Sequence, residues 1–194
     1  MATSSGVTFQ RALRISSAWI LLMLFVLITS RLSPIPFESF GVRPRTLAGL
    51  PGIFLMPLLH ANLTHLLANA IPLLILLTLL FWDRRYRPRS TMLLIWLASG
   101  LGTWLIGRSG RWQGVPVVHI GASALVFGLV AYFIVSGILM ESWRSALIGI
   151  LVLMFFGGML LGVIPQAGPI SWEGHLSGAV AGIWAARNQH RKSR

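Results

Sequence analysis

The chain has 194 residues, of which 55% are hydrophobic and only 10% are charged. Soluble globular domains carry about 25% charged residues, so this composition excludes a soluble fold as well as a disordered or collagen-like chain. A membrane-spanning helix needs about 20 apolar residues, and five or six such helices would use nearly the whole length. We therefore predict an all-α polytopic membrane protein that forms one domain over residues 1–194.

The net charge of +12 comes from 15 arginines and one lysine against four acidic residues. Most of the basic residues lie at the ends of apolar runs, where such residues set the orientation of a membrane protein and contact anionic lipid head groups. We therefore expect membrane lipids as partners and no nucleic acid. The chain has no cysteine, which excludes disulfides, thiolate-bound metals and cysteine nucleophiles.

Six apolar runs follow one another along the chain, and we interpret each as a spanning helix. The predicted helices cover about residues 15–29, 62–82, 91–106, 121–140, 146–164 and 172–186. A short basic segment (1–14) precedes them, a proline-containing stretch (31–61) forms a structured outer loop, and a basic tail (187–194) follows the last helix.

Six spans place both termini on the same side of the membrane. If that side is the cytoplasm, 11 basic residues lie in inner segments and five in outer ones, which agrees with the positive-inside rule. We therefore predict cytoplasmic termini, a location in the cell (inner or plasma) membrane, and outer starts for the second, fourth and sixth helices.

Four histidines lie at or just before those outer helix starts: His60, His65, His119 and His175. Ionisable side chains inside spans are costly and usually mark function. His65 and Asn69 are four residues apart and so share one helix face, whereas His60, five residues before His65, does not lie on that face. We interpret His60 as an anchor for the outer loop and His119 as a loop-packing residue.

Small residues surround two other polar side chains near the predicted outer surface. The first is Ser123, which follows Gly121, and the second is His175, which lies beside a ridge that includes Gly178 and Gly182. Taken alone, either pattern indicates only close helix packing. At a rise of about 1.5 Å per residue, however, both side chains fall in the outer half of an apolar core about 30 Å thick. The histidine–asparagine pair of the second helix falls at a similar depth.

Three motifs together resemble those of the rhomboid intramembrane serine proteases. The stretch from His60 to Asn69 matches that family's His-x4-His-x3-Asn pattern, and Gly121 to Ser123 resembles its Gly-x-Ser nucleophile motif. His175, with its glycine ridge, resembles the catalytic histidine helix. The motifs occur in the family's order on the second, fourth and sixth predicted helices, which indicates the minimal six-helix prokaryotic form.

The resemblance implies hydrolysis of peptide bonds in or near the transmembrane segments of other membrane proteins, which would be the substrates. It implies Ser123 as the nucleophile and His175 as the general base. The implied oxyanion donors are His65, Asn69 and the Ser123 backbone N–H. Residues expected to support the site structurally are His60, Gly121, Phe127 and Gly178.

The expected catalytic group is a Ser–His dyad. Glu173 lies two residues before His175, about 160° away around the helix, so we expect its carboxylate to point elsewhere. No metal or cofactor is implied. The chain departs from the family pattern at Ala124, where glycine is typical, and in its first outer loop, which lacks the family's Trp-Arg pair and must be anchored differently.

Three alternatives follow from the same residues. A catalytically silent rhomboid-like scaffold would bind transmembrane partners, although the presence of both Ser123 and His175 argues against it. A haem or metal protein would use the four histidines, but the missing cysteines and the lack of a His-Glu-x-x-His helix weaken this reading. A transporter would show an inverted repeat of broken helices, which the sequence lacks.

The fifth helix is our candidate for the wall that moves when a substrate helix enters from the lipid. It carries the adjacent glycines Gly157 and Gly158 and ends in a turn rich in proline and glycine, residues 165–169. Segments with little side-chain packing open most easily. Tight packing of the two glycines against a neighbour is the equally simple alternative.

Overall fold

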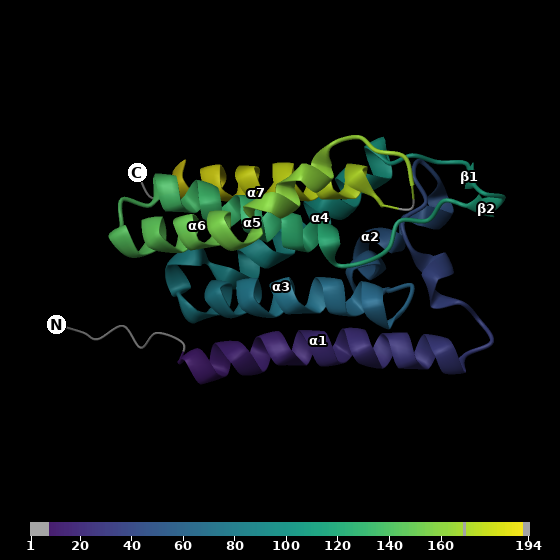
Figure 1. Ribbon diagram of the computed structural model, residues 1–194, viewed down its shortest axis with the longest axis horizontal. Coiled ribbons are helices and arrows are strands. Elements are labelled where there is room, and N and C mark those ends of the chain that lie inside the picture. The colour runs from purple at the N-terminus through teal and green to yellow at the C-terminus, as the bar shows by residue number, and fades with distance from the viewer. Residues whose placement is uncertain (1–7, 169, 192–194) are drawn as a thin grey trace.

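The computed structural model describes residues 8–168 and 170–191, and its elements are almost all helical (Figure 1). Within those residues, the long helices are α1 (Phe9–Leu32), α3 (Leu63–Trp82), α4 (Pro88–Ile106), α5 (Ser123–Leu139), α6 (Trp143–Phe156) and α7 (Trp172–Arg191). Each corresponds to one of the six apolar runs, so the prediction of an all-α fold is confirmed.

Short elements form the connections. Between α1 and α3 lie η1 (Phe37–Phe40), η2 (Leu47–Gly49), α2 (Gly52–Leu55) and η3 (Met56–Leu58). Later in the chain come η4 (Arg84–Tyr86), the antiparallel pair β1 (Arg111–Trp112) and β2 (Val115–Pro116), and η5 (Gly157–Val163). The structured loop expected over 31–61 is therefore a series of single helical turns that begins after α1 ends.

Helix bounds follow local sequence signals at some ends and depart from the prediction at others. Asn62 Oδ1 accepts a hydrogen bond from the His65 N–H at 2.8 Å, which caps the first turn of α3. The apolar run predicted over 146–164 is not one continuous α-helix, because the α-helical geometry of α6 ends at Phe156 and the 3-10 segment η5 follows. Two glycines open η5, and glycine weakens an α-helix more than other residues except proline.

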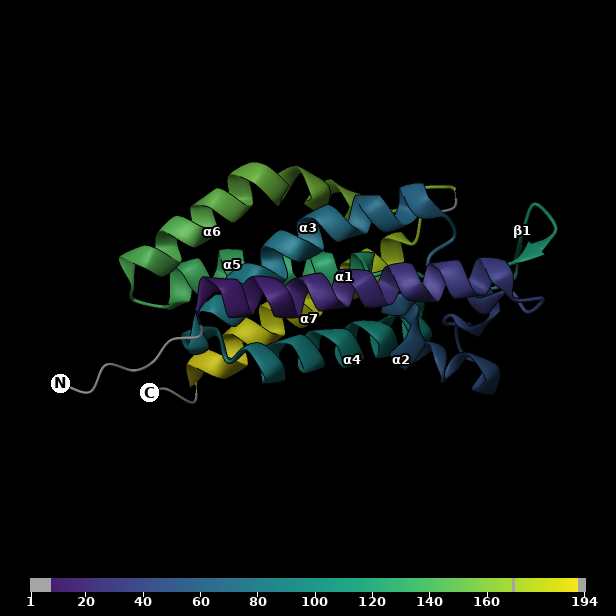
Figure 2. The ribbon, with the colours of Figure 1, turned by 90° about the horizontal axis from the view of Figure 1, so that it is seen from below.

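Helix α5 is the centre of the bundle. It packs against α3, α4, α6 and α7, while α1 packs against α3 (Figure 2). A Cβ atom on Gly178 would collide with the carbonyl oxygen of Ala124, and one on Gly182 with that of Gly128. The glycine ridge thus lets α7 approach the backbone of α5, and it brings the start of α7 beside the start of α5.

Four helical segments in the described part of the chain are long and apolar enough to cross a membrane. They are Phe9–Leu32, Leu63–Trp82, Arg84–Ile106 and Trp143–Val163. Helix α5 is apolar but has only 17 residues, and α7 carries several polar and charged residues along its length. The count of six spans therefore stays a prediction. Helix α1 begins and α7 ends at the same end of the bundle (Figure 1), as an even number of spans requires.

Arginine and tryptophan side chains from different elements anchor the outer loop to α4. Arg45 of the loop donates to the carbonyl oxygens of Leu105 and Gly107, both at 2.9 Å. Trp104 of α4 donates in return to the carbonyl oxygen of Thr46 at 2.9 Å. The loop thus has a tryptophan and an arginine at its anchor, but the tryptophan comes from a neighbouring helix.

Candidate active site

Ser123 and His175 meet at the end of the bundle that carries the β1–β2 hairpin. Ser123 is the first residue of α5, and His175 lies in the first turn of α7. Nε2 of His175 is 3.0 Å from Oγ of Ser123. The close contact of the two helices at Gly178, about one turn after His175, holds this spacing. A hydroxyl paired with an imidazole in this way can act as an activated serine nucleophile.

The second nitrogen of the His175 ring contacts the backbone of η5. Nδ1 lies 3.0 Å from the carbonyl oxygen of Gly162 in η5. A carbonyl oxygen can only accept a hydrogen bond, so this contact requires the proton on Nδ1 and leaves the Nε2 lone pair to accept from the Ser123 hydroxyl. The Phe127 ring stacks on the imidazole with centroids 4.0 Å apart and planes 10° apart, which fixes the plane of the histidine ring.

Two polar side chains of α3 lie beside Gly121, two residues before Ser123. Gly121 has φ of +105°, in the left-handed region that favours glycine. A Cβ atom there would lie 2.7 Å from Nε2 of His65 and 3.6 Å from Nδ2 of Asn69, so both side chains point at the turn that leads into the serine. Asn69 is buried and donates one amide N–H to the His65 carbonyl oxygen at 2.9 Å. Its Nδ2 atom thus lies close to this turn.

The backbone N–H of Ser123 adds a third donor at the same turn. Because Ser123 is the first residue of α5, its N–H is one of the four amides that have no partner inside the helix. The helix dipole adds partial positive charge at this end. Donors arranged in this way can stabilise the oxyanion that forms when a serine attacks a carbonyl carbon.

His60 is buried against the residue that precedes Ser123. Its Nε2 accepts a hydrogen bond from the Ala122 N–H at 3.5 Å, and its Nδ1–H donates to the Leu58 carbonyl oxygen at 3.4 Å. Burial, together with the neighbouring His65, lowers the pKa of His60 to about 4. A neutral His60 therefore joins the outer loop to the turn before the serine.

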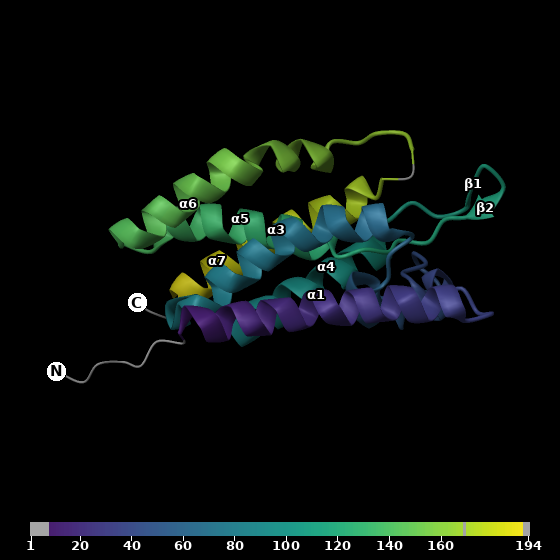
Figure 3. The same ribbon diagram turned by 60° about the horizontal axis from the view of Figure 1, so that its bottom comes forward.

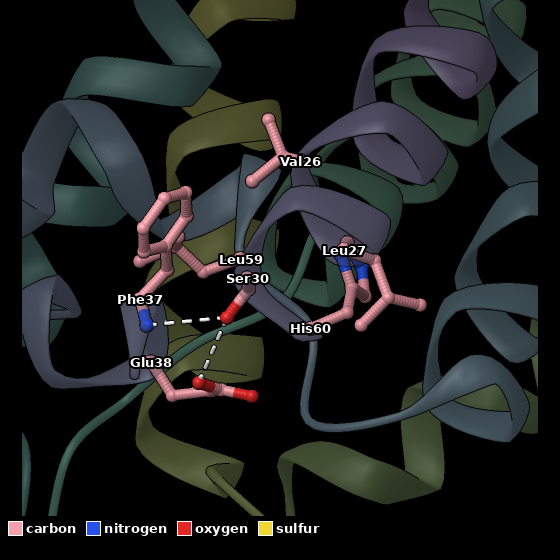
Figure 4. A pocket seen from close by; sticks show the side chains of 7 residues that line it. All are labelled: Val26, Leu27, Ser30, Phe37, Glu38, Leu59 and His60. Atoms are coloured by element: carbon pink, nitrogen blue, oxygen red, sulfur yellow. Dashed lines mark hydrogen bonds between the residues drawn. The ribbon is translucent and has the colours of Figure 1, made fainter. Parts of the chain in front are cut away.

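His60 also lines a small pocket, together with residues of α1, η1 and the outer loop (Figure 4). Ser30 Oγ donates to the Glu38 carboxylate at 3.3 Å and accepts from the Phe37 N–H at 3.2 Å. Arg31 also forms an ion pair with Glu38 at 3.2 Å. These contacts tie η1 to α1, so the polar groups around this pocket support the loop.

The structure places His119 in a second polar cluster. Its Nδ1 lies 2.6 Å from Oγ of Ser171, and its Nε2 lies 2.9 Å from the carbonyl oxygen of Arg108. Ser171 Oγ also accepts from the Gly174 N–H at 3.2 Å, which caps the start of α7. His119 thus connects the loop before α5 to the helix that carries His175.

The carboxylate of Glu173 belongs to this second cluster. Its Oε1 accepts from the Arg108 backbone N–H at 3.1 Å and lies 3.4 Å from Nε of the same arginine. Its hydrogen bond and its ion pair are both with Arg108. Within the described residues, no group of three or more histidine, aspartate or glutamate side chains is placed to hold a metal ion.

The sequence motifs do not include three residues of this region: Gly162, Arg108 and Ser171. A serine three residues before Gly174 at a helix start is a capping signal, and it would have identified Ser171. Gly162 acts through its backbone carbonyl, and Arg108 acts through its backbone and an ion pair with the distant Glu173. The sequence carries no local signal for either.

Comparison with known proteins decides the family. The family model of the rhomboid domain matches residues 48–192, which include all the side chains of the candidate site. The chain belongs to the rhomboid family.

Relatives of this chain are found in bacteria. An uncharacterized protein of Mycobacterium tuberculosis is 44% identical over 171 residues, which cover 87% of this chain and 71% of that protein. One of Mycobacterium leprae is 40% identical over 169 residues, covering 85% and 66%. YdcA of Bacillus subtilis, which bears the name of a proposed rhomboid protease, is 34% identical over 94 residues. These cover 47% of this chain and 42% of that protein.

Proposed function

We propose that this rhomboid is an intramembrane serine endopeptidase that cleaves peptide bonds in or near the transmembrane segments of other membrane proteins. The observation that carries the proposal is the 3.0 Å contact between His175 Nε2 and Ser123 Oγ. The Nδ1 contact to a carbonyl oxygen supports it, because that contact leaves Nε2 as the basic atom. Membership of the rhomboid family supports the reaction class.

In the proposed reaction, Oγ of Ser123 attacks the substrate carbonyl carbon while its proton passes to Nε2 of His175. The tetrahedral intermediate collapses, the C–N bond breaks, and the imidazolium gives its proton to the leaving amine. Water then attacks the acyl-enzyme, its proton passes to Nε2, and the acid product leaves as that proton returns to Ser123 Oγ.

The proposed oxyanion donors are His65, Asn69 and the Ser123 N–H. Their support is the convergence of both α3 side chains beside Gly121 and the position of Ser123 at the first turn of α5. These groups are fixed before the substrate binds, which is the condition under which such donors stabilise a transition state most effectively.

We infer that the protein lies in the cell membrane with six spans, both ends in the cytoplasm and the site open to the outer side. The 11-to-five distribution of basic residues between the two ends supports this orientation. A site inside such a bundle would receive its substrate helix from the lipid, and the basic inner segments would contact anionic lipid head groups.

The test compares membrane proteins released from cells that carry the wild-type chain, Ser123→Ala or His175→Ala. Either substitution should abolish release, and the double variant should be no worse than either single one, because the two residues act as a unit. Ser136→Ala is the matched control, since Ser136 is also a buried serine of α5. It should release the same fragments as wild type.

Two outcomes would overturn the proposal. Unchanged release by Ser123→Ala would show that the serine is not the nucleophile. If all variants cleave nothing but capture the same transmembrane proteins as wild type, the chain is a rhomboid scaffold and not a protease.

A further inference from the structure

We propose that the backbone carbonyl of Gly162 positions His175, in the place that a carboxylate occupies in a Ser–His–Asp triad, and that it couples the base to the α6–η5 wall. This inference rests on the proposed protease function. It gives η5 a role in the reaction, because the atom that orients the base belongs to that segment.

The first support is the pair of contacts made by the His175 ring. Nδ1 lies 3.0 Å from the Gly162 oxygen and Nε2 lies 3.0 Å from Ser123 Oγ. In a triad, the third group holds the imidazole in the tautomer with its proton on Nδ1 and stabilises the imidazolium. A carbonyl oxygen can do both. Glu173, the acidic residue closest to His175 in the sequence, is paired with Arg108 instead.

The second support is that a side chain at position 162 would crowd the His175 and Phe127 rings. A Cβ atom on Gly162 would lie 2.9 Å from Cζ of Phe127 and 3.2 Å from Nδ1 of His175. Phe127 is itself stacked on the imidazole and buried. The Gly162 backbone, the Phe127 ring and the His175 ring are therefore closely packed, and a side chain at residue 162 would press against both rings.

The third support is where η5 lies in the bundle. It continues α6 directly, and α6 runs along one edge of the bundle (Figures 2 and 3). Only 11% of the apolar stretch of Trp143–Val163 is buried, against 50% for Leu63–Trp82. A segment with few buried contacts moves at low cost.

Movement of this wall has a direct chemical consequence. If α6 and η5 swing outward to admit a substrate helix, the Gly162 oxygen leaves Nδ1 and the imidazole loses its fixed tautomer and position. The base is then oriented only while the wall is closed, so substrate entry and bond cleavage occur in separate states of the wall.

The experiment compares Gly162→Ala with Gly158→Ala, two identical changes within η5. A Cβ atom on Gly158 would meet no described atom within 4 Å, so this variant controls for the change in backbone propensity. Purified variants are treated with a fluorophosphonate, and the maximal rate of inactivation is measured separately from the half-saturating probe concentration.

Gly162→Ala should lower the maximal inactivation rate by about tenfold or more, because a displacement of about 1 Å in a catalytic group can cost on the order of 10²-fold. The half-saturating concentration should stay at the wild-type value, and Gly158→Ala should match wild type in both constants. A purely structural defect would instead lower the fraction of folded, reactive protein.

A second measurement reads the tautomer directly. In protein with 15N-labelled histidine, the His175 resonance, identified by its loss in His175→Ala, should show the proton on Nδ1 in wild type and in Gly158→Ala. It should show a mixture of tautomers in Gly162→Ala. The measurement on wild type alone shows which ring nitrogen of His175 carries the proton, so the proposal stays testable even if Gly162→Ala does not fold.

The outcomes separate this inference from the function beneath it. A folded wild-type protein that does not react with the probe would contradict the protease function itself. A reactive wild type with equal rates in both alanine variants would overturn the role of Gly162 and leave the dyad in place. A His175 proton on Nε2 would contradict both the role of Gly162 and Nε2 as the base, because a protonated Nε2 cannot accept the Ser123 proton.

Discussion

At the scale of single residues, the turn at Gly121 leads to a prediction for Asn69. Its Nδ2 atom lies close to the turn before Ser123, where the proposed oxyanion would form only as the reaction proceeds. Asn69→Ala should therefore lower turnover by up to about 10²–10³-fold, the range for one lost oxyanion donor. Two other donors remain, so this range is an upper bound. Steady-state cleavage of a transmembrane substrate gives kcat and KM, and a change confined to KM would contradict the assignment.

The lowered pKa of His60 predicts that the stability of the protein depends on pH. Burial and the nearby His65 lower its pKa from 6.5 to about 4, so between these values the unfolded chain takes up a proton that the folded chain does not. Stability is therefore unaffected above pH 6.5 and falls as the pH drops toward 4. A protonated ring could not accept the Ala122 N–H.

The measurement for His60 is the melting temperature in detergent at pH 7 and at pH 4.5, for wild type and His60→Gln. Glutamine can still accept the Ala122 N–H but does not titrate. The melting temperature of wild type should fall more on acidification than that of the variant. Equal losses would show that other buried histidines account for the acid sensitivity.

At the scale of elements, α6 and η5 form the wall that we expect to open. Phe156 packs against the core, whereas Phe155 is 75% exposed. Phe156→Ala should therefore loosen the wall and speed the entry of a transmembrane substrate, which raises the cleavage rate under conditions where entry limits it. Phe155→Ala should leave the rate unchanged. Both rates are measured in proteoliposomes. Faster cleavage by Phe155→Ala alone, or no effect of Phe156→Ala, would place substrate entry elsewhere.

The helices could be predicted because their signals are local. Apolar runs bounded by charged or capping residues, such as the run from Asn62 to Asp83, carry the period and ends of a helix in the sequence itself. The change from α6 to η5 was not predicted, because the apolar run continues through it, although the glycines at 157 and 158 are a local signal for the end of an α-helix. The anchor of the outer loop depends on Trp104 and Arg45, which are far apart in the sequence.

The candidate site was predictable to the extent that it depends on side-chain type. The spacing of His65 and Asn69, and the glycines beside Ser123 and His175, identify the groups that the structure brings together. The Gly162 carbonyl could not be found in this way, because every residue has a carbonyl and only the tertiary approach of η5 to α7 selects this one.

At the scale of the whole molecule, the orientation in the membrane is a separate prediction. Basic residues at the end where α1 begins outnumber those at the hairpin end, so that end should face the cytoplasm. Reporter fusions after Arg89 and Arg194 should both read inside, and a fusion after Gly114, in the β1–β2 hairpin, should read outside. Arg194 itself lies outside the described residues. An outside reading at Arg89 or Arg194 would overturn the six-span topology.

The most direct test of the protease account is to map the fluorophosphonate adduct on the purified protein by mass spectrometry. We expect one adduct, on Ser123, in wild type and in Ser136→Ala. We expect no adduct in Ser123→Ala and a greatly slowed reaction in His175→Ala, because the hydroxyl loses its base. A folded wild-type protein with no adduct, or with its adduct on another serine, would contradict the proposed protease function.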